Sequence, residues 1–259
     1  MATRIETLFA KLNTQNRKAL VTYIVAGDPD LEASQNILNS LPAAGADIIE
    51  LGIPFTDPVA DGPVIQAGAL RALGNGMTTA KLFQMVRNFR ENNADTPIVL
   101  MGYYNSVFAY GAERFAETAS AAGVDGLLIV DLPPEEEDEL AIPCKTHGLD
   151  FIRLATPTTD TARLPHVLKN ARGFLYYVAV AGITGTASAS AESLKPALEQ
   201  IRQQTDLPLC VGFGIKTPQD AKAMAGIADG VVVGSALVDL IANKADHSAF
   251  VNSLANKLL

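Results

Sequence analysis

The sequence has few of the side chains that build metal and redox sites. It contains only two cysteines, Cys144 and Cys210, and three histidines, and these lie far from one another along the chain. The spacing matches no zinc site and no redox motif, so we expect no metal site and two ordinary buried thiols. Unpaired thiols in turn favour the cytoplasm as the compartment.

Long apolar runs and an excess of positive charge are also missing. No run approaches the roughly 20 apolar residues that cross a bilayer, and Met1–Phe9 mixes acidic and basic side chains, unlike a secretory signal. The net charge of −8 argues against a general affinity for nucleic acid, which needs a basic surface. We therefore expect neither a membrane nor nucleic acid as a partner. A phosphate ester stays possible, because backbone N–H groups and helix dipoles bind such a ligand locally.

Short apolar segments alternate with longer helical patterns along the 259 residues. Apolar residues recur at helical spacing in Leu31–Ala43 and Ala80–Arg90. The expected strands are rich in Val, Ile and Leu at consecutive positions, as in parallel strands buried on both faces. They are Ala19–Val25, Ile48–Leu51, Ile98–Met101, Gly126–Val130, Phe151–Leu154, Phe174–Val178, Leu209–Val211 and Gly230–Val233. This alternation predicts an α/β fold, a (β/α)8 TIM barrel with a short N-terminal helix, as a single domain over 1–259.

Two groups of acidic residues have structural interpretations. Small residues, a glycine and then Asp47, Asp125 or Asp229 stand just before three of the expected strands. In a barrel such turns lie at the end opposite the active site, so we expect them to support stability. The run Glu135–Glu139 is typical of a solvated helix start, where acidic groups complement the helix dipole.

The second expected strand and the loop after it carry two carboxylates that suit chemistry. Glu50 stands in an apolar strand, where an unpaired carboxylate is costly to bury. If it points into the barrel mouth, burial raises its pKa as a general acid or base requires; alternatively, a Lys or Arg elsewhere pairs with it. Asp61 follows in a loop that three prolines restrict. A carboxylate there can stabilise positive charge on a substrate, although Asp61-Gly62 is also a common turn dipeptide.

Glycines follow each of the last three expected strands. Gly182-Ile-Thr-Gly185, Gly212-Phe-Gly214 and Gly234-Ser235 stand at successive strand ends. Glycine lets backbone N–H groups approach an anion closely, and a helix N-terminus adds a favourable dipole. Barrels commonly bind phosphate after strands 7 and 8. The predicted phosphate site is built from Gly185, Phe213, Gly214, Gly234 and Ser235.

The segment Glu50–Gln66, ELGIPFTDPVADGPVIQ, closely resembles the signature of the α subunits of tryptophan synthase. The resemblance covers essentially the whole chain in the right order. It continues at Gly27-Asp-Pro29, Tyr103-Tyr-Asn105-Ser-Val-Phe108, Asp131-Leu-Pro133 and the three glycine segments. It implies a lyase reaction, the retro-aldol cleavage of indole-3-glycerol phosphate to indole and glyceraldehyde 3-phosphate.

The resemblance also implies roles for individual residues. Glu50 would shuttle protons, protonating the indole ring carbon that bears the side chain and helping to deprotonate the glycerol hydroxyl. Asp61 would bind the indole N–H and stabilise the positive charge that develops on the ring. Tyr23 and Tyr103 match positions that line the indole pocket, although aromatic residues at strand ends also serve as plain packing. Thr184 lies in a segment that resembles a mobile lid and would reach toward Asp61 on closure.

The family resemblance further implies a protein partner. Indole would pass through a tunnel to a β subunit that carries pyridoxal phosphate, in an α2β2 tetramer. Pro54, Asp57, Asn105 and Phe108 match residues on loops that face the β subunit. The site segments hold no candidate Schiff-base lysine, so we expect no cofactor in this chain itself.

Three other functions stay open from the residues alone. Another phosphate-binding barrel, such as a sugar-phosphate isomerase or epimerase, would explain the glycines and one carboxylate but not the whole Glu50–Gln66 segment. A non-catalytic subunit that activates a partner would not need both carboxylates. A free-standing producer of indole without a β subunit fits the same residues.

Overall fold

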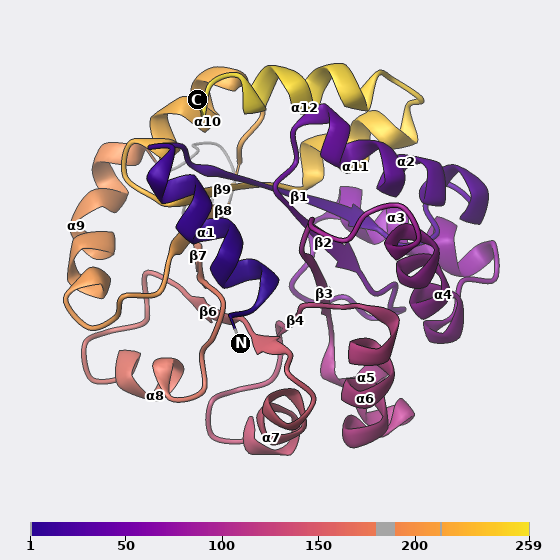
Figure 1. The fold of residues 1–259 in the computed structure, drawn as a ribbon, viewed down its shortest axis with the longest axis horizontal. Helices are drawn as coiled ribbons and strands as arrows, with labels where there is room; N and C mark the ends of the chain where they lie inside the picture. Colours follow the sequence, from indigo (N-terminus) through magenta and orange to yellow (C-terminus); the bar gives the residue numbers. More distant parts are fainter. Residues whose placement is uncertain (1, 180–189, 213, 259) are drawn as a thin grey trace.

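The computed structural model describes residues 2–179, 190–212 and 214–258. Its strands form one parallel sheet that closes around a central axis, as Figure 1 shows. The strands are β1 (Ala19–Val25), β2 (Ile48–Gly52), β3 (Ile98–Gly102), β4 (Gly126–Ile129), β5 (Asp150–Phe151), β6 (Arg153–Ala155), β7 (Leu175–Val178), β8 (Leu209–Gly212) and β9 (Gly230–Val233). Their order is β5-β4-β3-β2-β1-β9-β8-β7-β6, which confirms the predicted β/α barrel.

The fifth expected strand is divided, and this corrects the prediction of one strand over Phe151–Leu154. β5 pairs with β4, whereas β6 pairs with β7. Ile152 stands between the two pieces, and its N–H still donates to the carbonyl of Leu127 at 2.9 Å. β5 and β6 therefore occupy one barrel position, and the strand divides where its pairing passes from one neighbour to the other.

Helices surround the sheet on its outer face, except for the first helix, which lies across one end of the barrel (Figure 1). They are α1 (Arg4–Thr14), α2 (Leu31–Ala44), α3 (Pro63–Gly74), α4 (Thr79–Arg90), α5 (Tyr104–Tyr110), α6 (Ala112–Ala122), α7 (Asp138–Thr146), α8 (Leu164–Leu168), α9 (Ala191–Arg202), α10 (Pro218–Ala225), α11 (Ser235–Ala242) and α12 (His247–Ala255). α2 and α4 match the two helical patterns seen in the sequence. Within the described ranges, no helix has the length and apolar character that would let it cross a membrane.

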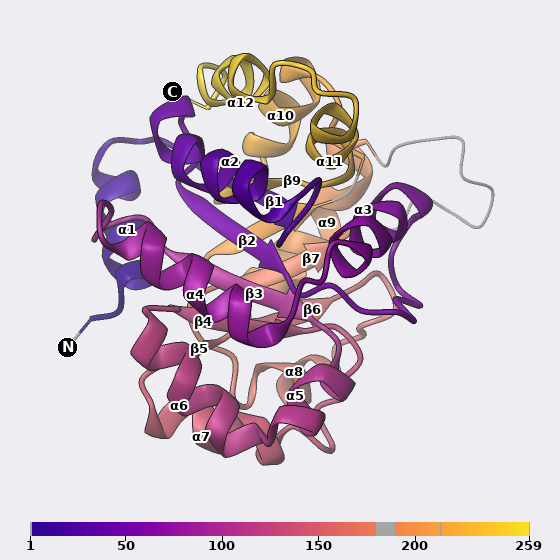
Figure 2. The same ribbon diagram turned by 90° about the vertical axis from the view of Figure 1, so that its right-hand side faces the viewer.

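The barrel interior is a core of its own, separate from the layer between strands and outer helices. Ile5, Phe9 and Leu12 of α1 pack there against inward-facing strand residues. Those strand residues are Ala19, Val21, Ile48, Val99, Leu128, Ile152, Phe174, Cys210 and Val232. Figure 2 shows α1 at one end of the barrel and α3, which follows β2, at the other. α1 thus closes the amino-terminal end, and the mouth lies where the strands end.

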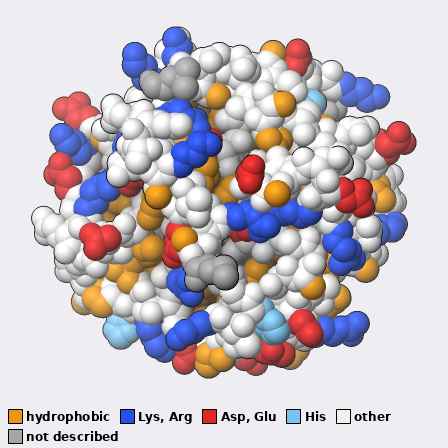
Figure 3. All heavy atoms as spheres, viewed as in Figure 1, with side chains coloured by type: hydrophobic (Ala, Val, Ile, Leu, Met, Phe, Trp, Pro, Cys, Tyr) orange, Lys and Arg blue, Asp and Glu red, His pale blue; other side chains and the backbone are white. Residues whose placement is uncertain are grey.

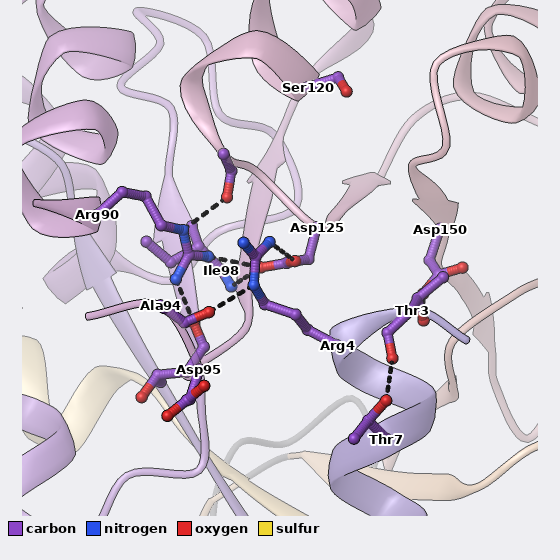
Figure 4. A network of polar contacts seen from close by, with 12 residues as sticks. Thr3, Arg4, Thr7, Arg90, Ala94, Asp95, Ile98, Ser120, Asp125 and Asp150 are labelled. Atoms are coloured by element: carbon purple, nitrogen blue, oxygen red, sulfur yellow. Dashed lines mark hydrogen bonds and ion pairs between the residues drawn. The ribbon is translucent and has the colours of Figure 1, made fainter. Parts of the chain in front are cut away.

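Polar contacts attach α1 to the barrel (Figure 4). Arg4 forms an ion pair with Asp125 at 2.8 Å, and Arg90 of α4 approaches the other oxygen of the same carboxylate at 2.6 Å. The Thr3 hydroxyl, at the N-cap of α1, donates to Asp150 at 2.7 Å. Asp125 thus joins the first helix to the β/α units that follow it.

The expectation for the acidic run Glu135–Glu139 is wrong at one position. Glu137 is fully buried, and its carboxylate lies 3.2 Å from the guanidinium of buried Arg153 on β6. The side-chain amide of Asn170 also donates to it at 2.8 Å. A buried carboxylate needs such partners, and they come from later parts of the chain.

Candidate active site

Glu50 points into the barrel from the centre of β2. In the parallel register it lies opposite Tyr23 of β1 and Val99 of β3. Side chains alternate between the two faces of a strand, so Glu50 shares the inward face with Ile48, a residue of the interior core. Its side chain is inward and buried, with the residue 1% exposed.

No charged partner neutralises this carboxylate within the described structure. Neither oxygen of Glu50 has a hydrogen-bond partner among the described residues. Burial raises the pKa of Glu50 to about 8, because the charged form loses its hydration. The alternative in which a Lys or Arg pairs with Glu50 therefore finds no support, and the group is protonated for the most part at neutral pH.

Asp61 approaches the same region from the loop between β2 and α3. Its N–H closes a turn onto the carbonyl of Pro58 at 3.0 Å, and Gly62 after it is the N-cap of α3. Partial burial raises the pKa of Asp61, and the nearby Tyr103 hydroxyl opposes that rise. Burial raises the pKa of the Tyr23 hydroxyl, with Asp61 and Glu50 as the next causes. Both carboxylates thus act on the pKa of one phenol, that of Tyr23, which lies opposite Glu50 in the strand register.

Tyr103 holds the loop that carries Asp61. Its hydroxyl accepts a hydrogen bond from the N–H of Ala60 at 3.0 Å. Its ring packs against Phe55 in the same loop, with the ring centres 5.4 Å apart. Burial raises the pKa of Tyr103 well above its usual range, and Asp61 adds to the shift. Tyr103 therefore reaches from the end of β3 to the loop of Asp61, and it is not merely packed at a strand end.

The sequence interpretation missed Tyr176 on β7. Burial raises the pKa of Tyr176, and the next cause is the charge of Glu50, so the phenol lies close to that carboxylate. A Cβ atom on Gly212 would overlap the Tyr176 hydroxyl, which accounts for the glycine there. Tyr176 stands two residues after Phe174 and so shares its inward face, but a tyrosine in a strand does not by itself indicate chemistry.

The described glycines that follow β8 and β9 lie at the same end of the barrel as the carboxylates. Gly234 is the N-cap of α11 and Ser235 its first residue. A Cβ on Gly234 would meet the Cβ of Tyr23 at 3.5 Å, which places the start of α11 beside Tyr23. Gly214, after the neighbouring strand β8, has φ of +72°, a conformation that favours glycine. Three further predicted site residues, Thr184, Gly185 and Phe213, lie outside the described residues.

The residues expected to face a partner stand on two neighbouring connections at the mouth. Pro54 and Asp57 lie in the loop after β2, and Asn105 and Phe108 lie on α5 after β3. Pro54 is partly buried, whereas the other three are exposed, and Phe108 is 68% exposed. Val59, in the same loop as Asp57, is 85% exposed. Phe108 and Val59 thus place two exposed apolar side chains on these connections.

A metal site is not apparent in the part of the chain that the structure covers. No group of three or more His, Cys, Asp or Glu side chains is arranged there to hold an ion. Both cysteines are free and buried. Among the described residues, the mouth brings together two carboxylates, three phenols and the N-terminus of α11.

This fold and this mouth define the class of the protein, a β/α barrel that carries two carboxylates and the start of a helix at the carboxyl ends of its strands. The family model for the tryptophan synthase alpha chain matches residues 9–257. The chain belongs to the tryptophan synthase alpha chain family, whose reaction is the cleavage of indole-3-glycerol phosphate.

Solved structures agree with this assignment over full length. Tryptophan synthase subunit alpha from Legionella pneumophila is 41% identical, with a TM-score of 0.92, and the match covers 100% of this chain and 99% of that one. A structure from Aquifex aeolicus is 37% identical, with a TM-score of 0.93 and 99% coverage of each chain. Tryptophan synthase from M. tuberculosis in its aminoacrylate-bound form is 32% identical, with a TM-score of 0.91 and 100% coverage of both chains.

Proposed function

We propose that Glu50 and Asp61 carry out the retro-aldol cleavage of indole-3-glycerol phosphate in this chain. The observation that carries the proposal is the burial of Glu50 inside the barrel with no hydrogen-bond partner among the described residues. A buried, protonated carboxyl at the mouth of a barrel is a proton donor that works near neutral pH. The single-barrel domain supplies both groups from consecutive segments.

Glu50 serves both proton transfers of the reaction. Its carboxyl protonates the ring carbon that bears the glycerol chain, which turns the indole ring into an electron sink. The resulting carboxylate then takes the proton of the hydroxyl on the adjacent side-chain carbon. The bond between ring and side chain breaks, its electrons return to the ring, and the aldehyde of glyceraldehyde 3-phosphate forms. The pKa of about 8 suits both steps, because neither form of Glu50 is far from the working pH.

Asp61 stabilises the positive charge that the ring acquires. In this proposal its carboxylate accepts a hydrogen bond from the ring N–H, which becomes more acidic when the neighbouring carbon is protonated. Partial burial strengthens such an interaction, because little water screens it. Tyr23 and Tyr103 form the walls between which the ring lies, and Thr184 belongs to a covering segment.

The phosphate group binds at the start of α11. Gly234 has no side chain to obstruct an anion, and Ser235 offers its N–H and its hydroxyl at the positive end of the helix dipole. Gly185, Phe213 and Gly214 complete this site in the proposal. The distance between phosphate and carboxylates is spanned by the glycerol chain of the substrate.

The protein partner in this proposal is a β subunit, bound through Pro54, Asp57, Asn105 and Phe108 in an α2β2 tetramer. Pyridoxal phosphate belongs to that subunit, which consumes the indole, and this chain carries no cofactor. The exposed Phe108 and Val59 support a protein contact at the mouth. The compartment is the cytoplasm, where the two buried cysteines stay as thiols.

Incubation of the purified chain with indole-3-glycerol phosphate tests the proposal directly. Indole and glyceraldehyde 3-phosphate should appear in equal amounts, and a β subunit from a relative should raise the rate. Formation of indole at the same rate with and without the β subunit would favour a free-standing indole producer. Absence of indole under both conditions would refute the proposed activity.

A further inference from the structure

Helix α5 lacks a cap from its own N-terminal residue. Tyr103 occupies the N-cap position, and its side chain makes no capping hydrogen bond. Asp131, which follows β4, instead accepts a hydrogen bond from the N–H of Tyr104 at 2.7 Å. A carboxylate is the preferred partner for the free N–H groups and the positive dipole at a helix start. Asp131 therefore caps α5 from the neighbouring β/α unit.

The side chain of Tyr104 is fixed by the same neighbouring unit. Its hydroxyl donates to the carboxylate of Glu139 in α7 at 2.5 Å. The connection between β4 and α7 is itself anchored, because buried Arg153 donates to the carbonyl of Leu132 at 3.1 Å. Both the backbone and the side chain of Tyr104 are thus held by a segment tied to the barrel wall.

Tyr103, the residue before Tyr104, holds the loop that carries Asp61. Tyr103 is covalently joined to Tyr104, and its hydroxyl accepts the N–H of Ala60 at 3.0 Å. The charge of Asp131 also contributes to the raised pKa of Tyr103, so the two side chains lie near each other. A shift at the start of α5 would therefore move the phenol that orients the loop.

We propose that Asp131 is a positioning residue, which sets the orientation of Tyr103 and through it the placement of Asp61. This inference rests on the proposed role of Asp61 in the reaction. Asp131 needs no contact with the substrate for this role. It acts through one hydrogen bond to Tyr104 and one hydrogen bond from Ala60 to Tyr103.

Two readouts on the full-length chain separate positioning from general stability. The first is the hydrogen-exchange rate of the Ala60 amide, measured by NMR without substrate. The second is the separate effect on kcat and KM for indole-3-glycerol phosphate. Asp131→Ala should speed exchange at Ala60 and lower kcat, each about five- to tenfold, while KM changes less than about twofold. KM is spared because the phosphate site at α11 lies on another unit.

Asp131→Asn and Glu117→Ala are the matched controls. The asparagine keeps an oxygen that accepts from Tyr104, so it should restore most of kcat and of the slow exchange. Glu117 is exposed on α6, and its loss should change neither readout. Unchanged exchange at Ala60 in Asp131→Ala would overturn the inference. Equal damage from Asp131→Asn would also overturn it, because the charge and not the hydrogen bond would then be required.

Failure of this inference is distinguishable from failure of the proposed function. If the wild-type chain makes no indole, the proposed function fails, while the exchange of the Ala60 amide still decides whether Asp131 positions the loop. If the wild-type chain makes indole and Asp131→Ala leaves the exchange rate of the Ala60 amide unchanged, only the positioning role fails.

Discussion

The two ends of the barrel hold their carboxylates in opposite ways. At the end that α1 closes, Asp125 accepts the N–H of Ile98 at 2.8 Å and forms ion pairs with Arg4 and Arg90. At the mouth, Glu50 is equally buried but has no hydrogen-bond partner among the residues the structure describes. The same chemical group is therefore held by ion pairs and a hydrogen bond at one end and buried without a described partner at the other.

The pattern at the α1 end repeats around the barrel. Each turn aspartate accepts a hydrogen bond from the backbone at or near the start of a neighbouring strand. The donors are Leu20 to Asp47 at 2.9 Å, Ile98 to Asp125 at 2.8 Å and Leu209 to Asp229 at 3.0 Å. An arginine also forms an ion pair with each turn aspartate. Arg17 pairs with Asp47, and Arg202 pairs with Asp229 at 2.8 Å. Figure 3, viewed toward α1, shows acidic and basic side chains interspersed over this face.

This contrast shows how one chain separates stability from chemistry. A carboxylate that is fully paired keeps its charge and adds to the free energy of unfolding, but it cannot exchange protons near neutral pH. A buried carboxylate without a partner lowers stability and gains a pKa in the working range. In this barrel the paired aspartates stand in the turns before the strands, whereas the unpaired Glu50 stands within β2 and faces the interior.

The largest effects should come from the mouth carboxylates. Glu50→Gln and Asp61→Asn should each lower the rate of indole formation by about a thousandfold or more, since each removes a group that acts on the ring. Circular dichroism should show an intact fold in both variants. Near-normal turnover in either variant would refute the role assigned to that residue.

Substitutions at the α1 end should lower the free energy of unfolding and leave kcat nearly unchanged. Asp125→Ala leaves the partly buried Arg90 without its anion, so the free energy of unfolding should fall by roughly 3 kcal/mol, the lower end for a buried pair. Urea denaturation measures this change, and kcat of the folded variant should stay within about twofold of the wild type. The exposed Asp138, paired with Lys169, is the control, and Asp138→Ala should leave stability unchanged. Equal losses in the two variants would contradict the comparison.

The buried Glu50 at the mouth should make the stability of the protein depend on pH. The pKa of Glu50 rises from 4.5 to about 8 on folding, so between these values the folded state holds a proton that the unfolded state has lost. The contribution of Glu50 to the free energy of unfolding is therefore fully present below pH 4.5. It is lost as pH rises toward 8, by at most roughly 1.4 kcal/mol for each pH unit. Glu50→Gln cannot titrate and should gain stability relative to the wild type between pH 5 and 8. A difference that is constant with pH would contradict the raised pKa.

The fold was predictable where the signal is local. β1 and β9 begin and end where their apolar runs do, because a strand buried on both faces needs apolar residues at every position. The division between β5 and β6 was not predictable, since it depends on which neighbours the strand pairs with. Glu137 was misjudged for a similar reason, because its partner Arg153 belongs to a later strand.

The position of a candidate site residue was predictable where the residue contradicts its surroundings. A carboxylate in an apolar strand pointed to Glu50, and a long family signature pointed to Asp61. Tyr176 gave no such contrast, because a tyrosine is an ordinary residue for a half-buried strand. The cap that Asp131 places on α5 joins two β/α units that only the closed sheet brings together.

The smallest effect should come from the start of α11, where charge and space can be separated. A Cβ on Gly234 would meet Tyr23 at 3.5 Å, an ordinary contact, so Gly234→Ala should fit and raise KM only slightly. Gly234→Asp adds a negative charge beside the proposed phosphate position and should raise KM about tenfold, with kcat less affected. The difference should shrink at high salt, because screening weakens the repulsion between the two anions. An unchanged KM in Gly234→Asp would remove this helix start from the phosphate site and leave the mouth carboxylates without their anchored substrate.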